Sequence, residues 1–232
     1  MAAVHDRWLA VCLTLFASVL YAEEPTEEEL ERWFESDETG PPYTNYGAGE
    51  QLEFLTAPAA KPVPRSRTHL SLSEQSLKDG WVAVSQCHDG LDPVPDAEVV
   101  YRFRRMRALK VTSHHGIAGV RVAGQSVQLK DAARGASLCV ELEAWLLQPT
   151  ADDQYHLRYG PFMRKFLDSY FPLQVQFTVT YPAERLRLLT VSPPPGEGFS
   201  HEAGVGHDRF EAWFRGKLTF ELLFQAIQAE RP

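Results

Sequence analysis

The chain has 232 residues, of which 44% are hydrophobic and 23% charged, and its formal net charge is −8. This composition is typical of a folded globular protein, and it excludes an intrinsically disordered chain and an integral membrane protein. The length allows one large domain or two small ones.

The first 22 residues have the features of a secretory signal. Asp6 and Arg7 precede the apolar run WLAVCLTLFASVLYA, which is fifteen residues long and ends at Ala22. A membrane-spanning helix needs about 20 apolar residues, whereas fifteen suit the apolar region of a signal peptide, with Ala22 as the small residue before cleavage. We therefore predict a signal peptide over residues 1–22 and an exported protein, periplasmic or extracellular. The alternative is an uncleaved segment that keeps the protein at the envelope membrane.

Residues 23–53 form an acidic arm. They carry eleven acidic side chains and one basic side chain, for a net charge of −10, whereas residues 54–232 have a net charge of +2. The negative charge of the protein therefore belongs to the arm and not to the body. Acidic arms either dock on a basic partner or stay solvated and keep the protein soluble, and the sequence favours neither.

A short helix is predicted within this arm. Thr26 and Glu29 form a capping box, and Leu30, Trp33 and Phe34 then fall on one face at helical spacing. This apolar stripe is a candidate docking surface, either for the basic residues of the body or for an external partner. Residues 54–67, which are rich in proline and alanine, are predicted to be an extended linker.

The body, residues 68–232, has the period-two pattern of antiparallel strands with one buried face. Apolar residues alternate with polar ones at Leu70 and Leu72, Val120 and Val122, Val127 and Leu129, Leu138 to Leu142, Val175 to Tyr181, and Leu218 to Phe224. Turn signals separate these runs at Asp79-Gly80, Asp92-Pro93, His115-Gly116, Arg134-Gly135 and Pro193 to Gly196. The predicted fold is mainly β: an antiparallel β-sandwich, either one large sandwich or two small ones in series, divided near residues 150–172.

One short helix is predicted within the body, near residues 161–171. Pro161 suits the first turn of a helix, and Pro172 ends it.

Two cysteines, Cys87 and Cys139, remain after removal of the signal peptide. In an exported protein such a pair indicates a disulfide. The neighbours of Cys87 are His88 and Asp89, and these three residue types could form an activated thiol. Because adjacent side chains on a strand point to opposite faces, we predict instead a structural bridge followed by a turn. No catalytic residue is assigned.

A metal site built on His88, His114 and His115 is the weaker alternative. Zinc and copper need three or four ligands at fixed distances, and the sequence has none of the usual ligand spacings, such as HExxH or CxxC. Paired histidines before a glycine are more often part of a solvated turn. We predict no metal and no cofactor.

The stretch YRFRRMRALK concentrates positive charge. It contains Arg102, Arg104, Arg105, Arg107 and Lys110. On a strand, Arg105 and Arg107 would point one way and the other three the opposite way. The stretch is a candidate site for an anionic envelope component or a protein partner, or else a solvated edge strand. Nucleic acid is excluded as a partner by export and by the acidic isoelectric point near 5.5.

These observations predict an exported, non-catalytic binding or accessory protein whose ligand the sequence does not reveal. Two alternatives stay open. One is an exported hydrolase or metal-dependent enzyme that uses the Cys-His-Asp region and the nearby histidines. The other is an envelope-anchored interaction protein with an uncleaved N-terminal segment, which would be its contact with the membrane.

Overall fold

Two β-sheets make up most of the body in the computed structural model, which describes residues 49–56, 63–150 and 153–227. The predicted signal peptide and the stripe of Leu30, Trp33 and Phe34 lie outside these residues. Among the described residues, no helix has the length and hydrophobicity needed to cross a membrane.

The large sheet has nine strands in the order β1-β14-β11-β2-β3-β6-β4, with β13 also beside β14 and β5 also beside β6. The strands are β1 (Glu53–Phe54), β2 (Arg65–Ser71), β3 (Trp81–Leu91), β4 (Val94–Val100), β5 (Met106–Ala123), β6 (Ser126–Trp145), β11 (Leu173–Thr180), β13 (Phe199–Gly204) and β14 (His207–Arg215). All pairs are antiparallel except that of β2 with β11.

The second sheet has four strands in the order β12-β15-β8-β7. They are β7 (Leu147–Pro149), β8 (Gln154–Phe162), β12 (Leu186–Ser192) and β15 (Leu218–Ala226). A separate hairpin is formed by β9 (Arg164–Phe166) and β10 (Ser169–Phe171), and the short helix α2 (Ser76–Asp79) precedes β3. The sequence pattern did not predict this helix.

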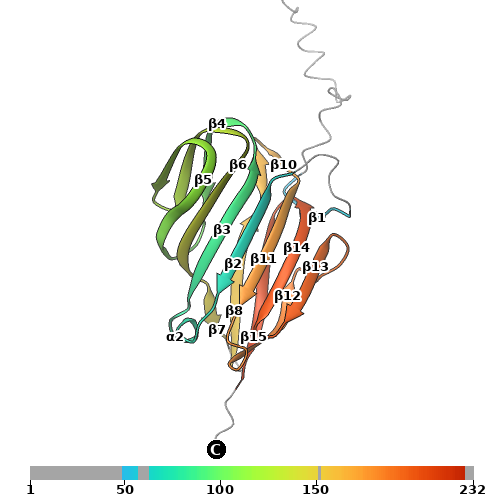
Figure 1. The fold of residues 1–232 in the computed structure, drawn as a ribbon. Coiled ribbons are helices and arrows are strands. Elements are labelled where there is room, and N and C mark those ends of the chain that lie inside the picture. Colours follow the sequence, from blue (N-terminus) through green and yellow to red (C-terminus); the bar gives the residue numbers. More distant parts are fainter. Residues whose placement is uncertain (1–48, 57–62, 151–152, 228–232) are drawn as a thin grey trace, which may run out of the picture. The chain divides into compact units, whose positions relative to one another are not determined.

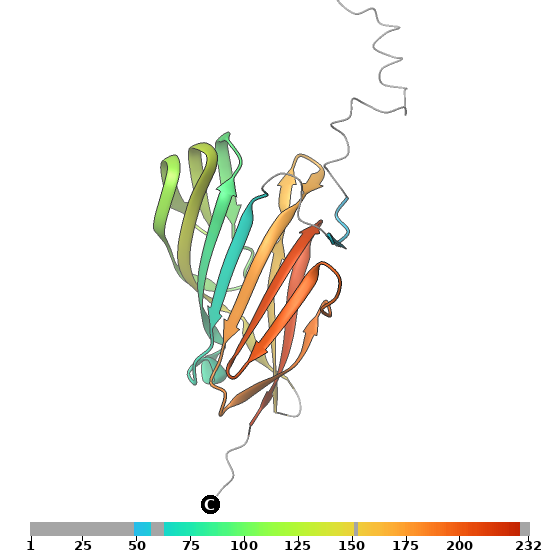
Figure 2. The same cartoon turned by 45° about the vertical axis from the view of Figure 1, so that its right-hand side comes forward.

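The two sheets pack face to face (Figures 1 and 2), with the large sheet in front of the small one in the view of Figure 1. Alternate residues of each strand point inward and form one hydrophobic core. At its centre the ring of Phe177 in β11 stacks on that of Phe220 in β15, with centroids 4.5 Å apart and planes at 11°. Burial of each such side chain contributes about 1.5–3 kcal/mol. The predicted mainly β, antiparallel sandwich is confirmed.

The body is one sandwich and not two in series. Strand β11 lies between β14 and β2, so residues from both ends of the body share the large sheet. Strand residues also occur before residue 68: β1 pairs with β14, where Glu53 accepts a hydrogen bond from Arg215, and β2 begins at Arg65. The folded body therefore begins earlier than the sequence pattern indicates.

Four strands of the large sheet, β3 to β6, end, begin or lose regular register at one level. β3 ends at Leu91 and β4 begins at Val94, and both pair with the same strand, β6. At this level Gly116 of β5 lies in a register irregularity opposite residues 133–136 of β6, and Gly116 and Gly135 have φ of 68° and 79°. Glycine tolerates this left-handed conformation, and such irregularities bend a strand. The turn signals at His115-Gly116 and Arg134-Gly135 thus mark a bend within two long strands and not their ends.

The predicted helix near residues 161–171 is wrong. Pro161 and Phe162 are the last residues of β8, and the rest of the segment is the β9–β10 hairpin, which turns at Leu167 and Asp168. Leu167 is 79% exposed and Phe166 65% exposed. A helix this short depends on burying an apolar face, and these two side chains find no surface to cover them.

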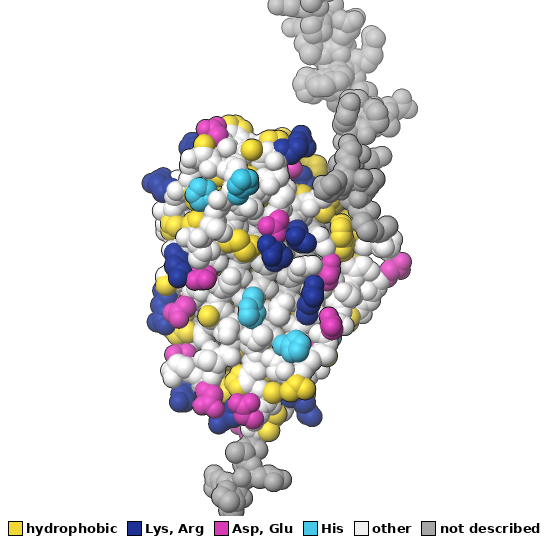
Figure 3. Space-filling view, viewed as in Figure 1, with side chains coloured by type: hydrophobic (Ala, Val, Ile, Leu, Met, Phe, Trp, Pro, Cys, Tyr) yellow, Lys and Arg dark blue, Asp and Glu magenta, His cyan; other side chains and the backbone are white. Residues whose placement is uncertain are grey.

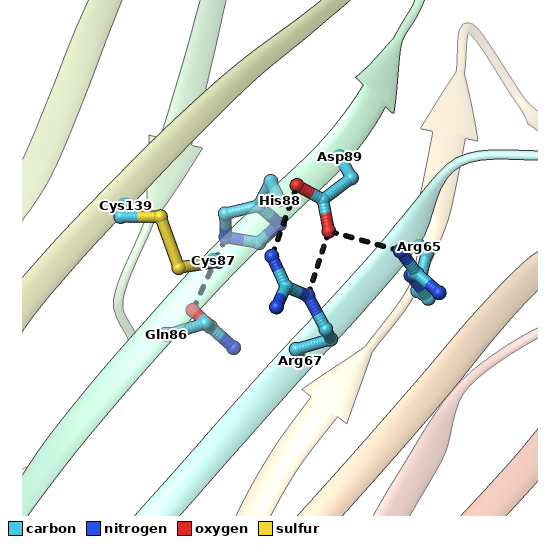
Figure 4. The surroundings of a disulfide bond; sticks show 7 residues. All are labelled: Arg65, Arg67, Gln86, Cys87, His88, Asp89 and Cys139. Carbon is cyan, nitrogen blue, oxygen red and sulfur yellow. Dashed lines mark hydrogen bonds and ion pairs between the residues drawn. A yellow bond between two sulfur atoms is a disulfide. The ribbon is translucent and has the colours of Figure 1, made fainter. Parts of the chain in front are cut away.

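Cys87 of β3 and Cys139 of β6 lie directly opposite each other on the outer face of the large sheet. Their sulfur atoms are at bonding distance, 2.12 Å, which is consistent with the predicted disulfide (Figure 4). The bridge ties together two strands near the bend.

Replacing Cys87 and Cys139 together with serine is expected to lower the free energy of unfolding by about 4 kcal/mol, because the bridge closes a loop across a sequence separation of 52 residues. Urea denaturation measures this difference. Reductant should bring the wild-type protein to the stability of the double variant and leave the variant unchanged. A wild-type protein that does not respond to reductant would contradict the bridge.

Candidate functional site

The residues of the Cys-His-Asp stretch do not converge. Asp89 accepts two hydrogen bonds from Arg67, at 2.8 and 3.2 Å, and Arg65 lies 3.6 Å away (Figure 4). His88 instead bonds to Gln86 through its Nε2 atom at 3.2 Å. Asp89 therefore does not orient His88, and Cys87 is bonded to Cys139.

The three histidines of the weaker alternative, a metal site, are also not arranged as metal ligands. His114 and His115 are exposed on β5, opposite Leu138 and Ser137 of β6, whereas His88 faces the interior. No group of three or more metal-binding side chains occurs in the part of the chain that the structure describes. The histidines that a hydrolase or metal enzyme would use are thus not brought together.

The basic stretch is divided between a loop and a strand. Arg102, Arg104 and Arg105 lie between β4 and β5, and Arg107 and Lys110 lie in β5. The prediction that Arg107 and Lys110 point in opposite directions is wrong.

A register irregularity between Arg107 and Lys110 places the two side chains on one face. There Arg107 binds Glu143 at 2.5 Å and Lys110 binds Glu141 at 2.8 Å. A bulge of this kind reverses the face to which the following side chains point, and the alternation of apolar and polar residues in the sequence does not reveal it.

The outer face also holds cation–π contacts. The guanidinium of Arg107 lies 4.2 Å from the ring centroid of Trp81, and that of Arg105 lies 5.4 Å from the ring centroid of Trp145. These contacts engage two arginines of the predicted anion-binding set. The rest of this face, seen in Figure 3, shows scattered charged and histidine side chains and only small hydrophobic areas.

The bend in the large sheet opens a cleft on the inner side, with a volume of about 700 Å³. The bent end of the sheet lies on one side, through β4 and β6, and β8, β9 and β10 contribute residues to the other. Apolar side chains that line it include Val94, Ala97, Val99, Leu129, Phe162 and Leu173. Several of them are only half-buried, which means that the core does not cover this end of the sheet.

A polar cluster lies at the β2–β3 side of the cleft. The amide nitrogen of Gln86 donates to the hydroxyls of Ser66, at 3.3 Å, and Thr68, at 2.9 Å. The carbonyl oxygen of Gln86 can only accept, so the 3.2 Å contact requires a proton on Nε2 of His88. In the neutral ring Nδ1 is then an acceptor.

Burial lowers the pKa of His88 to about 4, and the nearby carboxylate of Asp89 only partly opposes this effect. His88 is therefore uncharged at neutral pH. The inner part of the cleft offers hydrogen-bonding groups but no cation.

Tyr101 and Tyr159 also line the cleft, and burial raises the pKa of both hydroxyls. The Tyr159 hydroxyl is hydrogen-bonded with Thr68. The Tyr101 hydroxyl is buried and has no hydrogen-bond partner among the described residues. A buried polar group without a partner costs about 1–3 kcal/mol.

Charged residues surround the cleft, and the three carboxylates among them are engaged. Arg164 of β9 binds Asp92 through two hydrogen bonds, at 2.7 and 2.9 Å. Asp96 pairs with Lys130, and Glu98 accepts a hydrogen bond from Ser126 at 2.5 Å. The pair of Arg164 and Asp92 connects the bend to the hairpin across the cleft.

The sequence pattern does not predict this cleft. Gln86 and His88 occupy alternate positions of β3 that face the core, and Ser66 and Thr68 occupy such positions in β2. Four polar residues at positions expected to be apolar were the available signal, but one of them, Ser66, lay in the segment predicted to be a linker.

No family profile matches the chain, and a search of the curated proteins finds no relative. Among solved structures, the chain is similar to an M1 zinc metallopeptidase from Deinococcus radiodurans, with a TM-score of 0.39 and 12% identity over 78% of this chain. A mutant of that enzyme gives a TM-score of 0.37 and 13% identity. The match covers 43% of the length of each of these structures. Similarity at this level carries no argument about function.

Replacing Tyr101 with phenylalanine is expected to raise the free energy of unfolding by about 1 kcal/mol, because the change removes a buried hydroxyl without a partner. Tyr159→Phe is the matched variant and should lower it by about 1 kcal/mol, because it breaks a hydrogen bond. Urea denaturation compares the two. If both variants lose stability, the Tyr101 hydroxyl has a partner in solution.

The stability of the body is expected to fall in mild acid through His88. Its pKa is about 4 in the folded protein and 6.5 ordinarily, so protonation favours the unfolded chain. The stabilisation is complete above about pH 6.5 and is lost as the pH falls towards 4, by up to about 3 kcal/mol. His88→Gln should flatten this dependence in urea denaturation, and the exposed His114→Gln should not. Equal pH profiles for both variants would contradict the assignment.

Proposed function

We propose that the protein is an exported, non-catalytic binding protein that holds an amphipathic small molecule in the cleft. The observation that carries the proposal is the cleft itself, with its volume of about 700 Å³ and its mixture of apolar walls and a few polar groups. Ligand sites in proteins have volumes of about 300–1,000 Å³ and this kind of lining.

Export is supported by two features. The apolar run of residues 8–22 has the length of a signal sequence, and a disulfide such as that of Cys87 and Cys139 persists in oxidising compartments.

A binding role is favoured over hydrolysis by the geometry of the histidines. His88 is the histidine that lines the cleft among the described residues, and its hydrogen-bond partner is an amide, not a carboxylate. A general base needs a nucleophile within hydrogen-bond reach and a group that orients it. His88 has neither: Cys87 is in the disulfide and Asp89 is held by Arg67.

Binding can be measured with N-phenyl-1-naphthylamine, a neutral probe whose fluorescence increases in apolar surroundings. We expect saturable binding of one probe per chain. Ala97→Phe fills the cleft and should weaken binding at least tenfold, whereas Ala118→Phe adds the same ring at an exposed position of β5 and should not.

Circular dichroism and the melting temperature show whether the variants fold. Val99→Phe, on the same strand, is the second filling variant if Ala97→Phe does not fold. A wild-type protein that shows no saturable binding, or equal binding by folded Ala97→Phe and Ala118→Phe, would overturn the proposal.

A further inference from the structure

Arg102 differs from the other cations around the cleft. Arg164 is bound to Asp92, Arg65 lies near Asp89, and Lys165 lies 3.8 Å from Asp168. Arg102 lines the cleft and is exposed, and it has no ion-pair or hydrogen-bond partner in the described part of the chain.

The surroundings of Arg102 place it at the mouth of the cleft. Its neighbour Tyr101 is buried, and Val100, which also lines the cleft, is 50% exposed. Arg102 therefore lies where buried and solvent-exposed residues of the cleft lining meet.

We propose that the ligand of the cleft is a single-chain amphipathic oxyanion, a carboxylate or a phosphate monoester, whose head binds Arg102 while its apolar chain lies inside. This inference rests on the proposed function. The guanidinium presents paired N–H donors that match the two oxygens of such a head.

The distribution of charge inside the cleft fixes the direction of the ligand. The inner polar cluster of Ser66, Gln86 and His88 is uncharged at neutral pH. A charged head placed there would lose its hydration without an ion-pair partner, which is costly. At the mouth the head keeps contact with water and gains an ion pair, and the apolar chain leaves water. The hydration and ion pair of the head and the burial of the apolar chain therefore favour the same orientation of the ligand.

The test uses the full exported protein and displacement of N-phenyl-1-naphthylamine by decanoate, decyl phosphate and decanol, which share one chain length. We expect one or both anions to bind at least tenfold more tightly than decanol. Arg102→Gln should abolish this preference and leave the affinities for decanol and the probe unchanged. Arg104→Gln, an exposed neighbour outside the cleft lining, is the matched control and should keep the preference.

The arms of this experiment separate the two proposals. If the probe does not bind, the proposed function fails. If the probe binds and decanol displaces it as well as both anions do, or if Arg102→Gln and Arg104→Gln have equal effects, the function stands and the assignment of the oxyanion to Arg102 fails. Preference for decanoate or for decyl phosphate identifies the head group. Binding of the anions that Ala97→Phe leaves unchanged places them outside the cleft and also overturns the inference.

Discussion

The cleft depends on one bend in the large sheet, at which β3 ends, β4 begins, and β5 and β6 lose regular register. A straight sheet would continue beyond the small sheet as an exposed apolar face. Because the strands bend where Gly116 and Gly135 adopt positive φ, the inner residues of β4 and β6 border the open cleft instead. The bidentate pair of Asp92 and Arg164 connects this bend to the opposite side of the cleft. An exposed ion pair adds little to stability, but this one shows that the bend and the hairpin lie within hydrogen-bond distance of each other.

The buried polar residues show what this arrangement costs the fold. Ser66, Thr68 and Gln86 occupy inward positions that aliphatic side chains would fill with more stability, and the hydroxyl of Tyr101 lacks a partner. The aromatic cluster around Phe177 and Phe220 lies in the same core and supplies apolar burial that offsets this loss. Departures from the simplest core are expected where a protein binds something. Ser66, Gln86 and Tyr101 are such departures in the lining of the cleft.

The sequence predicted the type of fold well because alternation reports burial directly. In β11 and β15 every second residue is buried, as the pattern of Val175 to Tyr181 and Leu218 to Phe224 indicates. The misassignments have separate physical causes. Glycines that commonly mark turns also permit bends, so Gly116 and Gly135 were read as the ends of strands. The helix near residues 161–171 failed because no surface covers Leu167. The site was not predictable, since Gln86 of β3 and Tyr159 of β8 line one cleft only because strands distant in the chain are brought together.

The parallel pairing of β2 with β11 has a consequence for how the body folds. In this pair Ser66 lies beside Val175, so contacts at the middle of the large sheet join residues more than one hundred positions apart. The chain loses the entropy of closing such a long loop before strand pairing contributes any stability. Folding is therefore slow when non-local contacts dominate. The central strand order cannot be completed until β11 and β14 have been synthesised. A nascent chain of this protein therefore stays without its finished large sheet for most of its synthesis.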